Sequence, residues 1–217
     1  MDRCDLEPGD RCTKISPGCD HCYAERSALR LQRIGLEAYR NGFDVTLHVD
    51  LLNRPLGWKK PQMVFVNSMS DLFHRDIPEN FIGRAFDIME QADWHIYQVL
   101  TKRSPLMQRF INHRYSSEPC PAHIWLGVSV KNAAAKSRIP HLQKTHATMR
   151  FLSIEPLLAP VGELNLEGIH WVIVGGESGP QARPMDVEWA RSVREQCVSA
   201  GVPFFMKQMG GVRDKRG

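Results

Sequence analysis

Six short runs rich in β-branched and aromatic residues recur along this chain, and segments with helical periodicity separate most of them. Each run has the length and composition of a strand buried on both faces. Because parallel neighbours need a crossover, which helices supply, the alternation predicts an α/β fold: a partial or complete barrel, or an open doubly wound sheet. The predicted strands are residues 63–67, 95–100, 124–130, 149–154, 170–174 and 203–206.

Helix signals lie between most of these runs. Ser104, Asn132 and Asp186 stand where a side chain can cap the first turn of a helix. The gap between residues 154 and 170 is rich in proline and glycine and indicates a loop crossover. Helices are expected over 23–34, 78–92, 104–113, 133–144 and 187–200.

The length of 217 residues predicts a single domain over residues 1–217. Apolar residues at 42% and charged residues at 24% are ordinary globular values and exclude a disordered chain. No apolar run approaches the ~20 residues that a bilayer requires, and the first residues lack the apolar stretch of a signal peptide. We therefore expect a cytoplasmic protein that does not enter a membrane.

The net charge of +4 is unevenly distributed. Residues 101–150 hold nine Lys or Arg and one acid, Glu118, so this window carries +8 and the remainder −4. A basic side would attract phosphate, and Lys102 and Arg103 are candidate nucleic-acid contacts within it. The alternative is a solvated helical face.

Polar residues follow every predicted strand. The carboxyl ends of parallel strands meet on one rim, where α/β folds place their sites, although polar turn residues alone would give the same pattern. The strand-end residues are Asn67 to Asp71, Thr101 to Arg103, Ser129 to Asn132, Glu155, Gly175 to Ser178, and Lys207 with Gln208.

Cys12, Cys19 and Cys22 have C-x6-C-x2-C spacing directly before a predicted helix. Without a secretory signal, disulfides are not expected, and three close thiolates favour an iron–sulfur cluster with one open iron. Zinc is the alternative, because Cys4 could complete a closed four-thiolate site, and unligated cysteines are a third reading. His21 is expected to support the loop without being a ligand, Cys197 to lie in the core, and Cys120 has no assigned role.

Seven blocks carry a family resemblance. The chain resembles the phage gene-product thirty-seven/sixty-eight proteins, which are similar to radical S-adenosylmethionine enzymes and, among them, to spore photoproduct lyase. The match spans residues 12–211. Its blocks, in order, are CTKISPGCDHCYAER, FVNSMSDLFH, LTKRS, WLGVSVKN, RFLSIEPLL, WVIVGGESGPQARPM and PFFMKQMGG.

The resemblance implies a partial (β/α)6 TIM-like barrel of the radical S-adenosylmethionine type. It implies a [4Fe-4S] cluster on Cys12, Cys19 and Cys22 whose open iron chelates S-adenosylmethionine and cleaves it reductively. The other cofactor-binding candidates are Ser68, Ser70 and Asp71 for the methionine amino group, Ser129 and Lys131 for ribose or carboxylate, and Glu155 and Glu177 for ribose or substrate. Each could instead be a turn residue.

Family members also begin with a strand before the first cysteine. Residues 1–11 show no strand pattern, so we expect an irregular segment and a missing or replaced first barrel strand. The function expected is a radical S-adenosylmethionine protein acting on nucleic acid or a nucleotide. The alternatives are a non-catalytic zinc or iron–sulfur module, and a phosphate-binding barrel using Gly175 and Gly176.

Overall fold

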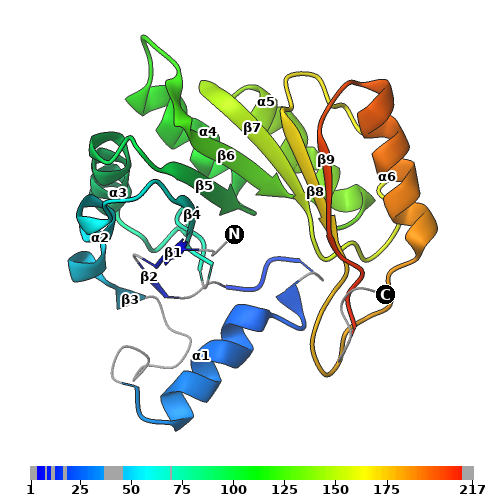
Figure 1. Cartoon of the computed structure of the whole chain (residues 1–217), viewed down its shortest axis with the longest axis horizontal. Coiled ribbons are helices and arrows are strands. Elements are labelled where there is room, and N and C mark those ends of the chain that lie inside the picture. Colours follow the sequence, from blue (N-terminus) through cyan, green and yellow to red (C-terminus); the bar gives the residue numbers. More distant parts are fainter. Residues whose placement is uncertain are drawn as a thin grey trace.

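The computed structural model describes residues 4–7, 9–10, 13–16, 19–36, 46–68 and 70–211. Seven strands form one all-parallel sheet that curls into a half-barrel (Figure 1). The spatial order follows the chain without reversal, so the sheet lacks the switch point of a doubly wound fold. In order, the strands are β1 (Cys4–Leu6), β4 (Met63–Val66), β5 (Ile96–Thr101), β6 (Cys120–Ser129), β7 (Ala147–Ile154), β8 (Trp171–Gly175) and β9 (Phe204–Gln208).

The first strand is present, so the expectation that it is missing is wrong, and residues 4–6 and 9–10, within the segment expected to be irregular, are strands. Strand β1 pairs in parallel with β4, with Leu6 beside Val66, and Leu6 is buried in the core. Three residues are too few to show an alternating pattern, and pairing with β4 supplies the hydrogen bonds that fix the strand. A separate ribbon joins β2 (Gly9–Asp10) to β3 (Thr46–Leu47).

Helices follow most of the strands, as predicted. They are α1 (Tyr23–Arg33), α2 (Arg54–Gly57), α3 (Glu79–Gln91), α4 (Ser104–Arg114), α5 (Ile139–Gln143) and α6 (Val187–Ser199), with 3-10 turns at η3 (Val49–Leu51) and η4 (Ala133–Arg138). The helix expected over 133–144 is divided into η4 and α5, and Pro140 lies in the first turn of α5, where a missing N–H costs nothing. Residues 155–169 contain no helix, in agreement with the predicted loop crossover.

Two of the three predicted caps are confirmed. Asn132 accepts a hydrogen bond from the backbone N–H of Ala135, and Asp186 accepts one from that of Glu188. Ser104 is not a cap: Arg103 holds the N-cap position of α4 and Ser104 is its first helical residue.

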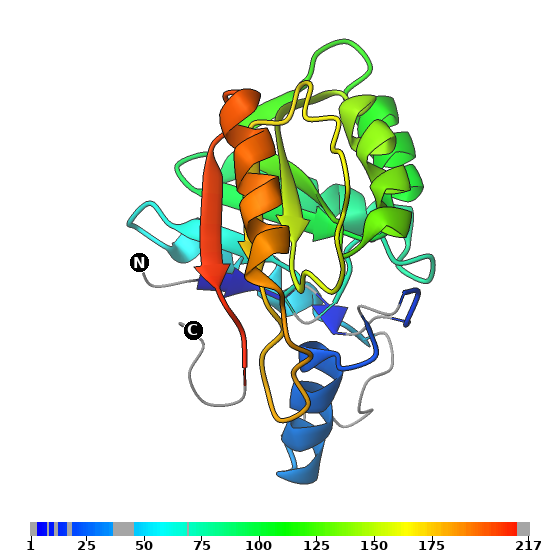
Figure 2. The same ribbon diagram turned by 90° about the vertical axis from the view of Figure 1, so that its right-hand side faces the viewer.

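The two faces of the sheet have different neighbours. Convex-face side chains of β4 to β8 pack with those of α3 to α6 in one hydrophobic core. Helix α1 instead extends away from the sheet, below its carboxyl edge (Figure 2). Within the described residues, no helix has both the length and the apolar composition needed to cross a bilayer. The concave face and the carboxyl edge are therefore the surfaces that the main helical layer leaves available for a site.

Candidate functional site

A cavity of about 480 Å³ lies at the carboxyl ends of the strands, between the sheet and the segment that contains Cys19 and Cys22. Its volume is in the ~300–1,000 Å³ range of small-molecule sites. Residues of all seven strands of the sheet, or of the turns after them, reach its wall, so the rim predicted from the strand ends does enclose a single space. The predicted site residues on the wall are Cys19, Cys22, Ser68, Ser70, Lys102, Ser129, Lys131, Glu155 and Glu177.

Cys19 and Cys22 bring their thiols to this wall. Cys19 is buried, and its sulfur lies 3.6 Å from the Ser16 hydroxyl. Burial opposes the thiolate, but a backbone hydrogen bond at Ile15, the Ser16 hydroxyl and the charge of Lys102 together lower the pKa of the Cys19 thiol. The thiolate is the form that ligates metal. Cys22 lies at the N-cap position of α1, so both cysteines stand at or just before a helix start.

Cys12, the third predicted ligand, lies outside the described residues, as do Pro17 and Gly18 in the turn before Cys19. Of Cys4 only the backbone is described, in β1. Among the residues that the structure does describe, no three His, Cys, Asp or Glu side chains form a metal-holding group. The described part of the predicted ligand set is therefore the pair Cys19 and Cys22.

Asp71 lies behind the cavity wall and is not part of the lining. Its Oδ1 accepts hydrogen bonds from Thr101 Oγ1 at 2.6 Å and from the Phe73 N–H at 3.1 Å. Its Oδ2 accepts from the Lys102 N–H at 3.1 Å and from Arg103 Nη1 at 2.9 Å. Asp71 is 2% exposed. The Asp71 carboxylate is therefore hydrogen-bonded within the chain and does not reach the cavity where a ligand would lie.

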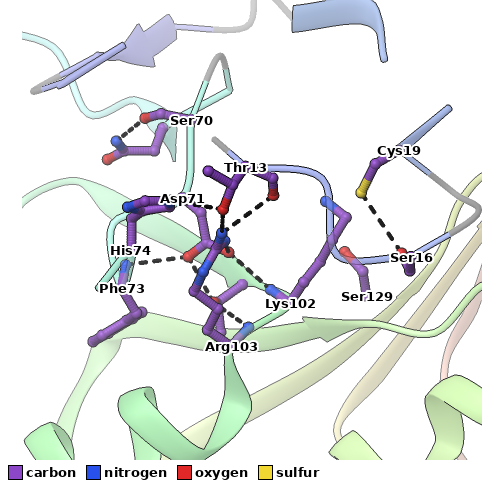
Figure 3. Close-up of polar contacts among 12 residues, drawn as sticks. Thr13, Ser16, Cys19, Ser70, Asp71, Phe73, His74, Lys102, Arg103 and Ser129 are labelled. Carbon is purple, nitrogen blue, oxygen red and sulfur yellow. Dashed lines mark hydrogen bonds and ion pairs between the residues drawn. The ribbon is translucent and has the colours of Figure 1, made fainter. Parts of the chain in front are cut away.

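Arg103 links Asp71 to the cysteine segment, the stretch from Thr13 to Cys22 (Figure 3). Its Nη2 donates to the Thr13 carbonyl at 3.2 Å and to the Thr13 hydroxyl at 2.9 Å. The same hydroxyl lies 2.9 Å from His74 Nε2. Because His74 Nδ1 accepts from the Asp76 N–H, its Nε2 carries the proton, and burial lowers the His74 pKa so that the ring stays neutral. Asp71, Arg103 and His74 thus hold Thr13.

Glu177 holds the opposite side of the segment. Its carboxylate accepts from Arg183 through the backbone N–H, Nε at 2.8 Å and Nη2 at 2.6 Å. His21 Nδ1 lies 3.4 Å from Glu177 Oε2 and 2.8 Å from the Gln181 carbonyl. Although burial opposes it, the hydrogen bonds and charge of Arg183 lower the Glu177 pKa to about 2. The loop after β8 therefore binds His21, which lies between the two described cysteines in the sequence.

Lys131 and Glu155 are two further charged residues on the cavity wall. Burial and the nearby charge of Lys102 lower the Lys131 pKa to about 7. Lys207 Nζ reaches both oxygens of Glu155, at 2.6 and 2.7 Å, and Gln208 Nε2 donates to one of them at 3.3 Å. Gly175 keeps this corner open, since a Cβ there would lie 3.2 Å from the Glu155 carboxyl carbon.

The nine basic residues of the 101–150 window differ in exposure, and the basic side stays a prediction. Lys131 is buried, and Arg109 and Lys144 are the exposed members of the nine. Hydrogen bonds within the chain fix five others, because their positions on strand ends and helix turns bring carbonyls and carboxylates within reach. These five are Arg103, Arg114, Lys136, Arg138 and Arg150.

Sequence reasoning missed Thr13, His74 and Arg183 as parts of the site. Each contacts a residue far away in the sequence or across a loop, so no local spacing relates them. A usable signal for Arg183 was present: buried carboxylates need a partner, and Glu177 follows a buried strand. Nothing comparable indicated Thr13.

Neither a curated protein nor a solved structure matches this chain at a significant level. A family model matches residues 5–216, which is nearly the whole chain and includes the cysteine segment and every strand end of the cavity. The chain therefore belongs to the DUF5131 family, described as proteins of unknown function.

Proposed function

We propose that this protein is a radical S-adenosylmethionine-like iron–sulfur protein that acts on nucleic acid or a nucleotide. The observation that carries the proposal is the shared cavity: Cys19 and Cys22 face the same space as the polar ends of the parallel strands. A cofactor held by the cysteines would thus meet a substrate or second cofactor held by the strand ends.

The residues present fit such a cluster. Cys12, Cys19 and Cys22 would hold three irons, which leaves one iron open for S-adenosylmethionine. The pKa of Cys19 is lowered, which favours the ligating form. Lys102 and Lys131 lie on the same wall and would offset the negative charge of a thiolate-bound cluster. When bound, the cluster would supply reductive cleavage of S-adenosylmethionine.

The other wall residues have separate tasks in this proposal. Ser68, Ser70 and Ser129 offer hydroxyls to the methionine and ribose groups, and Lys131 offers its Nζ as a hydrogen-bond donor to the carboxylate. Glu155, held by Lys207, faces the same space and can accept hydrogen bonds from ribose hydroxyls. In this proposal Asp71 and Glu177 do not bind the ligand. Asp71 positions the cysteine segment through Arg103, and Glu177 positions it through His21.

The test is iron binding by the full chain after anaerobic reconstitution with iron and sulfide. We expect about four irons per chain and broad absorbance near ~400 nm. Cys12→Ala, Cys19→Ala and Cys22→Ala should each abolish iron binding, because three thiolates are the minimum anchor. Cys120→Ala and Cys197→Ala are matched controls on buried cysteines far from the cavity and should retain iron.

Cys4→Ala decides whether the cluster has an open iron. Retained iron in this variant supports three-thiolate ligation. If Cys4 proves as necessary as the other three, the site is closed and the catalytic proposal fails. A colourless protein with one tightly bound zinc would support the non-catalytic alternative.

A further inference from the structure

The two faces of the half-barrel differ in burial. Convex-face side chains such as Val64, Leu126 and Val172 are 0% exposed under the helices. Their neighbours on the concave face are also apolar, yet Trp125 and Trp171 are only partly buried and Phe205 is 48% exposed. Contiguous apolar surface of this kind on a protein commonly marks a binding site.

Four aromatic rings form the centre of this concave face. They come from four neighbouring strands, and the register of those strands places them on one side of the sheet. The Trp171 ring centre lies 5.7 Å from that of Trp125, 6.4 Å from that of Phe151 and 6.1 Å from that of Phe205. We call Trp125, Phe151, Trp171 and Phe205 the aromatic platform.

Gly127 shapes the platform. Gly127 pairs with Phe151 across β6 and β7, and a Cβ at position 127 would lie 2.4 Å from the Phe151 ring. Any larger residue would force the ring out over the sheet. The glycine therefore lets Phe151 lie across β6, where it is 1% exposed, packs against Trp171 and lines the cavity floor. The platform rings that a ligand can reach are those of Trp125, Trp171 and Phe205.

The platform continues into the cavity. Phe151 and Ile173 line the cavity floor, and Lys207, two residues beyond Phe205 on the same face of β9, stands on its wall. Lys102 and Lys131 stand on the wall as well. Moving along the strands, a ligand would meet aromatic rings first and cationic side chains next.

We propose that the platform binds the nucleobase of a nucleotide or of single-stranded nucleic acid, with the phosphate toward Lys102. Bases stack on aromatic side chains whatever their identity, and lysine ammonium groups attract phosphate. A nucleotide has the same order of groups, from flat ring to anion, as this surface. The inference rests on the proposed function for its substrate class, but base binding itself requires neither cluster nor S-adenosylmethionine.

The test is calorimetric titration of the full chain, without cluster, at low salt. The probes are cytidine monophosphate, ribose 5-phosphate and an oligodeoxycytidylate of about eight nucleotides. Cytosine is used because adenine would also report on a site for S-adenosylmethionine. We expect the monophosphate to bind at least ~5-fold more tightly than ribose 5-phosphate, the smallest effect of one stacked base. Tighter binding of the oligonucleotide would identify a strand as the source of the base, and equal binding a mononucleotide.

Variants locate the binding. Trp171→Leu keeps apolar volume without the ring and should weaken cytidine monophosphate binding about 5- to 150-fold. Phe205→Ala, at a half-exposed position where the fold is not at stake, should weaken it as well. Trp94→Leu is the matched control, an exposed tryptophan in the turn between α3 and β5, and should leave the affinity unchanged. Thermal melts verify that each variant is folded.

Three results would overturn the inference: equal binding of cytidine monophosphate and ribose 5-phosphate, undiminished binding by both Trp171→Leu and Phe205→Ala, or dissociation of a dimer by Trp171→Leu, which would make the face a protein interface. Cys19→Ala should still bind cytidine monophosphate. A chain that stacks the base but holds no iron would refute the proposed function alone, and one that holds iron but stacks no base would refute this inference alone.

Discussion

Each oxygen of the Asp71 carboxylate accepts two hydrogen bonds, and all four donors belong to the chain itself. A carboxylate so satisfied has little capacity left for a ligand. Its partner Arg103 is also nearly buried, with a side chain 9% exposed, and Arg103 binds Thr13 in the cysteine segment. At the scale of single residues, the buried charges at the strand ends therefore hold the segment in place.

Asp71→Asn should destabilise the fold. The change keeps the shape but leaves Arg103 without its counter-charge, and it turns the amide NH2, a donor, toward groups that are themselves donors. Breaking a buried ion pair from one side costs about 3–5 kcal/mol, or roughly 6–20 °C in melting temperature for a chain of this size. Glu188→Gln, which breaks the exposed ion pair with Arg191, is the control and should change the melting temperature little. Similar melting temperatures for both variants would contradict the role given to Asp71.

The contribution of Glu177 to the stability of the fold should depend on pH. Its folded pKa of about 2 lies below the unfolded value near ~4.3, so its ion pair with Arg183 stabilises the fold above that value. This contribution is lost as the pH falls toward 2. The difference in melting temperature between the natural chain and Glu177→Gln should therefore be largest at pH 6–7 and shrink steadily below about pH 4.5. A difference that stays constant with pH would show that the charge of Glu177 does not contribute.

At the scale of elements, periodicity and turn residues predicted all six long strands, because each is a run of apolar residues buried by its neighbours. Strand β1 was not predicted, because three residues are too few to show a strand periodicity. It forms by pairing with β4, a contact between segments far apart in the sequence. The strand-end rim was predictable for the same reason that the strands were. Which rim residues turn into the cavity was not: Asp71 and Ser70 are one residue apart, and only Ser70 lines it.

Gly127→Ala tests how β6 and β7 fit together. The added Cβ would collide with the Phe151 ring, and overpacking of this kind typically costs about 1–3 kcal/mol. Adding Phe151→Leu should recover part of the loss, because the smaller side chain removes the collision. Urea unfolding of the two single variants and the double variant measures this coupling.

Gly83→Ala is the matched control. Gly83 lies inside α3, where a Cβ would meet nothing closer than Arg114 Nη1 at 4.0 Å. Alanine should stabilise the helix by about 0.5–1 kcal/mol. If Gly127→Ala is also neutral or stabilising, or if Phe151→Leu brings no recovery, the ring does not cross β6 as described.

At the scale of the whole molecule, the two faces of the half-barrel have different roles. The convex face holds the core with α3 to α6, whereas the concave face leads from the aromatic platform to the cavity and the cysteines. Helix α1 is tied back to the loop after β8 through Arg26, whose Nη2 donates to the Ser178 carbonyl at 3.2 Å. Base, second cofactor and cluster would thus lie in sequence along one continuous surface.

The most direct test of this account is the electron paramagnetic resonance spectrum of the reconstituted, reduced protein, recorded with and without S-adenosylmethionine. If Cys12, Cys19 and Cys22 leave one iron open to the cavity, adding S-adenosylmethionine changes that iron's ligands, and the spectrum must shift. A chain that holds about four irons but gives the same spectrum in both samples would contradict the account, since its cluster would then have no position for the second cofactor.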